Sequence, residues 1–175
     1  MADLLPEKWM KGVAVTTTVL AVLTAIASSR SAFYVAQAQL LTALEGSKWA
    51  YYQAKSIKQS LAETQLNGFQ VELLGVTNPK QKELMDVKMK NCSSEISRYE
   101  QEKTEIRQSA ENVAKENALA GRRGGHLSLA VVFFQIGIML SSVSALVKRR
   151  ELWYLGLVFG VLASVFLANA FLLFY

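Results

Sequence analysis

The sequence predicts an all-α membrane protein, with three transmembrane helices and a long antiparallel coiled-coil hairpin between the first and the second. Two observations predict this fold. Three apolar stretches are almost free of charge, and the charged middle of the chain repeats apolar residues at alternating steps of three and four. Only 19% of the 175 residues are charged, against about 25% in soluble domains. We divide the chain into residues 1–30 with the first span, residues 31–121 as the hairpin with its tip at residues 68–78, and residues 122–175 with the last two spans.

The apolar stretches cover residues 12–29, 127–147 and 152–175. A helix needs about 20 residues to cross the hydrocarbon core, so the second and third are long enough and the first is the shortest. The first also resembles a signal peptide, because residues 25–27 read Ala-Ile-Ala after a basic flank and an apolar run. Since the helical pattern continues straight through that site, we expect a retained helix.

Small residues recur at every fourth position of the spans, which lets helices pack closely in lipid. The predicted helix-packing residues are Thr17, Ala21, Ala25, Gly137, Gly156, Gly160 and Ser164. No acidic, basic or histidine side chain lies inside a span, and this argues against a proton-coupled carrier or an ion pump.

The basic residues near the spans predict the orientation. The short turn at residues 148–150 reads Lys-Arg-Arg, and such turns stay in the cytoplasm. We therefore expect a cytoplasmic N-terminus and a periplasmic hairpin. Arg30, Arg122 and Arg123 flank the hairpin and oppose this orientation, but long loops cross a membrane largely regardless of charge.

The first arm of the hairpin is predicted to continue from the first span without a break. Its heptad seam consists mostly of small or apolar residues, namely Phe33, Ala36, Leu40, Ala43, Ser47, Ala50, Ala54, Ile57 and Leu61. Gly68 marks the expected end of this helix.

The second arm is predicted to begin at Pro79 with Asn78 as its cap, and to end at Gly121. Gly124 and Gly125 are expected to loosen the joint before the second span. Its seam is Met85, Met89, Cys92, Ile96, Tyr99, Lys103, Ile106, Ala110 and Val113. The apolar pattern pairs the two seams with Leu61 opposite Met85, Ile57 opposite Met89 and Ala54 opposite Cys92.

Two groups of side chains are candidate partner contacts. Phe69, Leu73 and Leu74 make the hairpin tip apolar where a solvated tip is normally polar, so they either contact a partner or fold back over the last seam layer. Trp49 and Tyr52 belong to an aromatic and cationic cluster that suits either packing or a partner.

Catalysis is not expected, because no nucleotide-binding, nucleophile or metalloprotease motif occurs. With Cys92 and His126 as the single cysteine and histidine, we expect no metal site and no cofactor. The net charge of +5 resides largely in basic clusters at the span ends, so we expect contact with membrane lipid and none with nucleic acid.

Three segments carry a resemblance to a known family. Residues 49–59 read Trp-Ala-Tyr-Tyr-Gln-Ala-Lys-Ser-Ile-Lys-Gln, Phe134-Gln135 lies in the second span, and Lys-Arg-Arg precedes the third. The chain resembles the uncharacterised bacterial domain-of-unknown-function family numbered four-three-three-seven. The resemblance implies a bacterial inner-membrane setting and lends no activity. Many members carry a tail rich in His and Glu at the N-terminus, which is short and without His here, so no metal role carries over.

These patterns favour a structural or interaction protein that forms a homo-oligomer through its spans and its hairpin. One alternative is an oligomeric channel or transport accessory with the first span lining the pore. Another is an envelope adaptor or sensor that docks an unidentified protein partner through the apolar tip.

Overall fold

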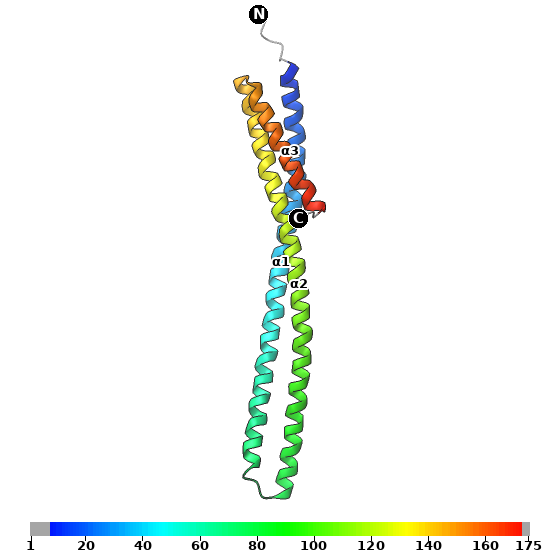
Figure 1. Ribbon diagram of the computed structural model, residues 1–175, viewed down its shortest axis with the longest axis vertical. Coiled ribbons are helices and arrows are strands. Elements are labelled where there is room, and N and C mark those ends of the chain that lie inside the picture. The colour runs from blue at the N-terminus through cyan, green and yellow to red at the C-terminus, as the bar shows by residue number, and fades with distance from the viewer. Residues whose placement is uncertain (1–7, 173–175) are drawn as a thin grey trace, which may run out of the picture. The chain divides into compact units, whose positions relative to one another are not determined.

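The computed structural model describes residues 8–172, and over this range the chain is entirely helical apart from two short connections. The helices are α1 (Lys8–Leu73), α2 (Pro79–Val147) and α3 (Arg150–Leu172), as Figure 1 shows. Each contains a window long and apolar enough to cross a membrane. The last three residues of the predicted third span lie outside the described residues.

The helix boundaries confirm two predictions. Helix α1 runs from the first apolar stretch into the middle of the chain without interruption. Helix α2 begins at Pro79, and the backbone N–H of Lys80 donates to Asn78 Oδ1 at 3.1 Å, which satisfies a donor that the first turn leaves without a helical partner.

Two predicted helix ends were wrong. Helix α1 continues past Gly68 to Leu73, and α2 continues through Gly121, Gly124 and Gly125 to Val147. A glycine inside a helix costs about 1 kcal/mol, which packing can outweigh. Gly124 is buried, and a Cβ there would lie 3.4 Å from Val35 Cγ2, so this glycine permits close helix contact rather than a hinge.

The contacts divide the chain into two units. One comprises Met1–Gln39 with Asn117–Tyr175, and we call it the membrane unit; the other is Leu40–Glu116, and we call it the hairpin unit. Each unit contains parts of both α1 and α2.

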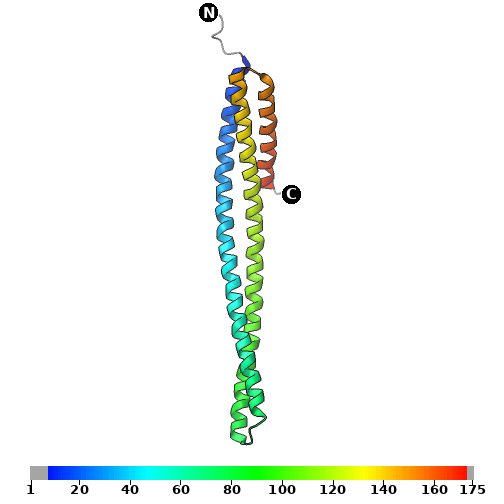
Figure 2. The same ribbon diagram turned by 90° about the vertical axis from the view of Figure 1, so that its left-hand side faces the viewer.

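The membrane unit brings together parts of all three helices, which lie close to one another in Figures 1 and 2. Its core consists of small and large apolar residues, namely Leu20, Ala27, Ala130, Phe134 and Ala163. Phe133 of α2 and Phe166 of α3 stack beside this core with ring centroids 5.4 Å apart.

Glycines bring α2 and α3 into backbone contact. A Cβ on Gly156 would lie 2.9 Å from the carbonyl oxygen of Gly137 and 2.7 Å from Ser141 Oγ. A Cβ on Gly160 would lie 2.9 Å from Leu20 Cδ2 of α1. A larger residue at Gly156 would therefore push α2 and α3 apart, whereas one at Gly160 would displace the end of the Leu20 side chain.

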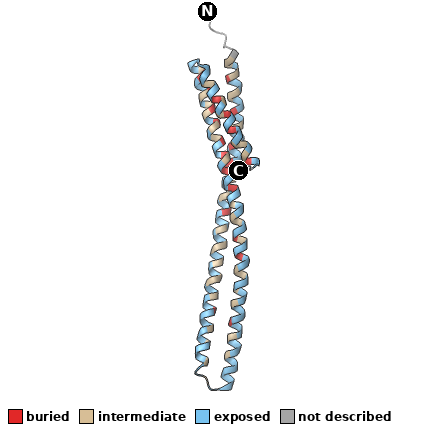
Figure 3. Cartoon of the chain, in the orientation of Figure 1, coloured by how far each residue is buried: buried red, intermediate tan, exposed pale blue. Residues whose placement is uncertain are grey.

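In the hairpin unit, α1 and α2 lie side by side in both views and are joined by residues 74–78. Few of its residues are fully buried, as Figure 3 shows by colour. They are Leu41, Ala62, Cys92, Ile106 and Ala110. Two helices alone can cover only one side of each other, so this unit has a single narrow seam and leaves the opposite faces open.

Candidate interaction surface

Ten covered residues of α1 in the hairpin unit follow a strict heptad spacing, and we call them the inner stripe. Each member is buried or half-buried. The members are Leu41, Glu45, Lys48, Tyr52, Lys55, Gln59, Ala62, Leu66, Phe69 and Leu73. The nine seam residues expected on α2, from Met85 to Val113, are all buried or half-buried as well.

The inner stripe corrects the sequence-based seam of α1, which lies on another face of the helix. Phe33, Ala36, Leu40, Ala54, Ile57 and Leu61 are all exposed. The pairing also differs. Ile57 was expected opposite Met89, whereas Lys55 contacts Glu102 and Gln59 contacts Lys103. A stripe of mostly small or apolar residues was taken to face α2, but a stripe with polar or charged residues at half of its positions does.

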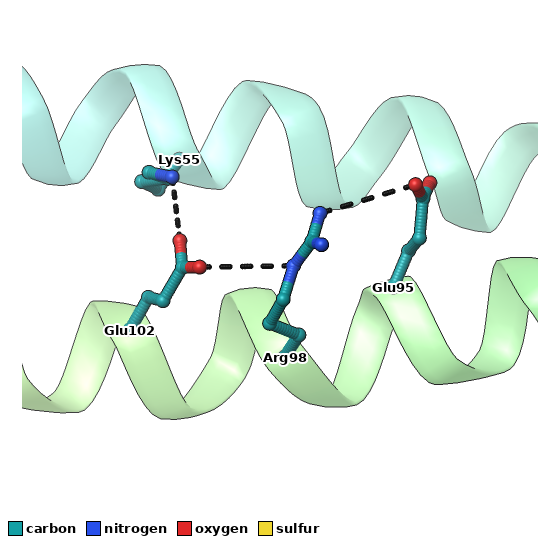
Figure 4. Close-up of polar contacts among 4 residues, drawn as sticks. All are labelled: Lys55, Glu95, Arg98 and Glu102. Carbon is teal, nitrogen blue, oxygen red and sulfur yellow. Dashed lines mark ion pairs between the residues drawn. The ribbon is translucent and has the colours of Figure 1, made fainter.

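Ion pairs allow the polar residues of the inner stripe to face α2. Lys55 Nζ of α1 lies 2.5 Å from Glu102 Oε2 of α2, and Glu102 Oε1 lies 3.7 Å from Arg98 Nε. Arg98 in turn lies 3.9 Å from Glu95, as Figure 4 shows. The hydrogen bond from Lys55 holds the pKa of the Glu102 carboxyl below its usual range, and the same bond raises the pKa of Lys55.

The long side chains of the seam also cover apolar surface with their stems. Lys55 Nζ lies 5.5 Å from the ring centroid of Tyr99, and Lys103 Nζ lies 5.3 Å from that of Tyr52. Lys103 also donates to Gln59 Oε1 at 3.1 Å. The methylene chains can therefore lie against the other helix while the charged heads reach a partner.

The opposite face of α1 carries an uncharged row that we call the outer stripe. All seven members are exposed, and Leu40 and Ile57 each expose 70% of their surface. The members are Leu40, Ala43, Ser47, Ala50, Ala54, Ile57 and Leu61. In a two-helix hairpin this is the position farthest from the partner helix, where polar residues are expected.

The corresponding face of α2 has the usual composition. Its exposed positions, two residues after each seam position, are Val87, Asn91, Ser94, Arg98, Gln101, Glu105, Gln108, Asn112 and Lys115. Eight of these nine are polar or charged, so this face of α2 has no row that matches the outer stripe.

The family comparison covers almost the whole chain. The family described as a domain of unknown function, DUF4337, matches residues 9–173. The chain belongs to this family. No curated protein and no solved structure matches it.

The aromatic and tip residues predicted as partner contacts differ in how far they are covered. Trp49 and Tyr52 are half-buried and pack edge to face, with ring centroids 5.7 Å apart. Phe69 and Leu73 are half-buried, and Lys88 Nζ lies 5.4 Å from the Phe69 ring centroid. Leu74 exposes 88% of its surface, so it is the tip residue most open to a partner.

The predicted packing residues of the spans divide into three groups. Gly137, Gly156 and Gly160 are buried in contacts within the chain. The hydroxyls of Thr17 and Ser164 donate to carbonyls of their own helices, at 2.8 Å and 2.9 Å. Ala21 and Ala25 are exposed.

The metal-binding residue types do not gather in the part of the chain that the structure describes. No group of three or more His, Cys, Asp or Glu residues there is placed to hold a metal ion. Cys92 is buried in the seam as a free thiol, and His126 stacks on Phe166 with centroids 6.3 Å apart. A buried free cysteine in such surroundings serves as a small apolar residue.

Proposed function

We propose that this chain is an integral membrane protein with a structural or interaction role, without catalysis, and that it acts as a homo-oligomer. One observation carries the proposal: the outer stripe of α1 places apolar residues where a free-standing hairpin would be polar. Surfaces of this kind on a soluble segment mark contacts with another chain.

The proposal includes an antiparallel coiled-coil arrangement of α1 and α2 in the hairpin unit. The contact of Lys55 with Glu102, together with that of Phe69 with Lys88, supports it, because a later residue of α1 meets an earlier residue of α2. Heptad spacing on both seams is what such packing requires.

A second observation, in the membrane unit, supports association between copies. Gln135 is exposed on the apolar part of α2, where its amide would face lipid in a single chain. Amide side chains in spans commonly hydrogen-bond across helices, and the exposed Ala21 and Ala25 permit close approach of a neighbouring span.

Light scattering of the full chain in a mild detergent tests the proposal. We expect a mass of two or more chains after correction for bound detergent. A monomer at all protein concentrations would contradict it.

The proposed setting is the bacterial inner membrane, with a cytoplasmic N-terminus and a periplasmic hairpin. Glu72→Cys in a Cys92→Ala background places a single thiol at the tip. An impermeant thiol reagent applied to intact cells should label it if the tip is periplasmic. Labelling only after lysis would reverse the orientation.

A second candidate function is docking of another protein at the hairpin tip. The exposure of Leu74 and Val71 favours it, since neither is covered within the chain. Replacing Leu73 and Leu74 with serine should then remove a protein that co-purifies with the chain, whereas an unchanged set of bound proteins would argue against docking. The channel alternative gains no comparable support, because the hydroxyls of Thr17 and Thr24 bond back to their own helix.

A further inference from the structure

We infer that the outer stripe of α1 is the docking face for the outer stripe of a second copy, with the two α1 helices parallel and in register. This inference deepens the proposed function and rests on it. It adds the face, the partner and the geometry, which the homo-oligomer alone leaves open.

The charge distribution of α1 is the first argument for a second copy. Between Leu40 and Leu61 the helix carries four charged residues, and three of them, Glu45, Lys48 and Lys55, lie on the inner stripe. Lys58 is the exposed one and lies beside the outer stripe rather than in it. Two such faces can meet without like-charge repulsion, while a strongly charged partner would find no complementary group along the row.

The hairpin unit offers the outer stripe no better match than itself. Most outer positions of α2 are polar or charged, and burying Glu105 or Lys115 against an uncharged row would cost desolvation without a partner charge. An apolar row paired with its own copy is self-complementary, as the interface of a twofold dimer must be.

The membrane fixes the direction of the pairing. Copies inserted in the same orientation can be related by a twofold axis along the membrane normal, so their α1 helices run parallel. Each stripe residue then lies near its own equivalent. The row spans three heptads, about 32 Å at about 1.5 Å per residue, which suffices for a coiled-coil contact.

The order of side-chain sizes suits this contact. Leu40 lies at one end, with Ile57 and Leu61 at the other. The positions between them are all small, namely Ala43, Ser47, Ala50 and Ala54. Small residues let two helices approach closely, and the larger ones fill the space at each end.

The membrane unit, taken by itself, has the same feature on α1. The same three-four spacing, continued toward the N-terminus, falls on seven exposed residues. Six are apolar, namely Val15, Val19, Val22, Ile26, Phe33 and Ala36, and one is polar, Ser29. A partner with an apolar helix of its own in the membrane matches this pattern, and a second copy has one.

Disulfide trapping in native membranes tests the inference on the full chain. Ser47→Cys and Ala54→Cys are each introduced into a Cys92→Ala background, and Gln101→Cys on the outer face of α2 is the matched control. Parallel, in-register helices place each new thiol near its equivalent, within the separation of about 4.4–6.8 Å between Cα atoms that a disulfide needs. After mild oxidation, we expect most of each α1 variant to migrate as a covalent dimer on a non-reducing gel. The control should form at least tenfold less covalent dimer.

The outcomes separate this inference from the proposed function. An oligomer by light scattering that forms no disulfide at either α1 position overturns the docking face and leaves the homo-oligomer standing. A monomer by light scattering overturns both. Equal linking of Gln101→Cys would reveal random collision and would also overturn the inference, as would a disulfide to a different protein.

A charge variant gives independent evidence. Adding Ala50→Glu to the Ala54→Cys chain places two carboxylates at the centre of the contact, and we expect at least a tenfold loss of covalent dimer. Circular dichroism verifies that the helix content is retained. Unchanged linking in a folded chain would overturn the inference.

Discussion

Replacing Ile106 or Ile57 with alanine removes the same atoms from two different environments in the hairpin unit. Ile106 lies in the seam and exposes 9% of its surface, while Ile57 lies in the outer stripe and exposes 70%. A fully buried isoleucine contributes about 1.5–3 kcal/mol by transfer from water. With the cavity left behind, we expect Ile106→Ala to destabilise the unit by about 2–4 kcal/mol. Because Ile57 is covered over less than a third of its surface within one chain, its removal loses less than a third of that transfer free energy. We therefore expect Ile57→Ala to destabilise a single chain by under about 1 kcal/mol.

Thermal unfolding of the full chain in detergent, followed by circular dichroism, measures the difference. For a unit of this size, 1 kcal/mol corresponds to a shift of about 4–8 °C in Tm. Ile106→Ala should therefore lower Tm by about 10 °C or more at every protein concentration. The effect of Ile57→Ala should be small in dilute samples and should grow with concentration, because association stabilises by mass action. Equal effects of both variants in dilute samples would refute the reasoning and place Ile57 in the seam between α1 and α2.

Two further predictions concern the ion pair and the helix contact in the membrane unit. Because the pKa of Glu102 is lowered by Lys55, the stability from this pair is present at neutral pH and is lost as pH falls below the usual glutamate value of about 4.3. Glu102→Gln should flatten the acid side of a Tm-against-pH curve, whereas Glu105→Gln on the outer face should not; matching curves for both would disprove the role of the pair. Gly156→Ala should destabilise the contact between α2 and α3 by about 1–3 kcal/mol through overpacking. Gly121→Ala, with open space around its Cβ, should be neutral or stabilising, and equal thermal stability of these two variants would argue against the contact.

The three apolar helices follow from local sequence, because a span needs only length and a lack of charge. The start of α2 is local in the same way, since Asn78 and Pro79 suit the first turn whatever the rest of the chain does. The family resemblance likewise rested on short motifs and is confirmed over nearly the whole chain.

The helix ends at Gly68 and Gly121 were mispredicted for a physical reason. A glycine lowers helix stability by a small, fixed amount, while the benefit of continuing the helix depends on contacts far away in the sequence. Gly124 illustrates this, because its value lies in the closeness of Val35 and Tyr34, which belong to another helix.

The sequence by itself determined that α1 carries heptad stripes and that α2 carries an apolar one. Only the tertiary structure decided which stripe of α1 faces α2. Hydrophobicity ranks the outer stripe first, but the contact is decided by whether each polar side chain reaches a partner. Lys55 reaches Glu102, and Lys103 reaches Gln59. The inner stripe can therefore be covered by α2 while these two ammonium groups keep a polar partner. The apolar stripe is then left on the surface, and pairwise geometry of this kind is not encoded in the periodicity of either helix.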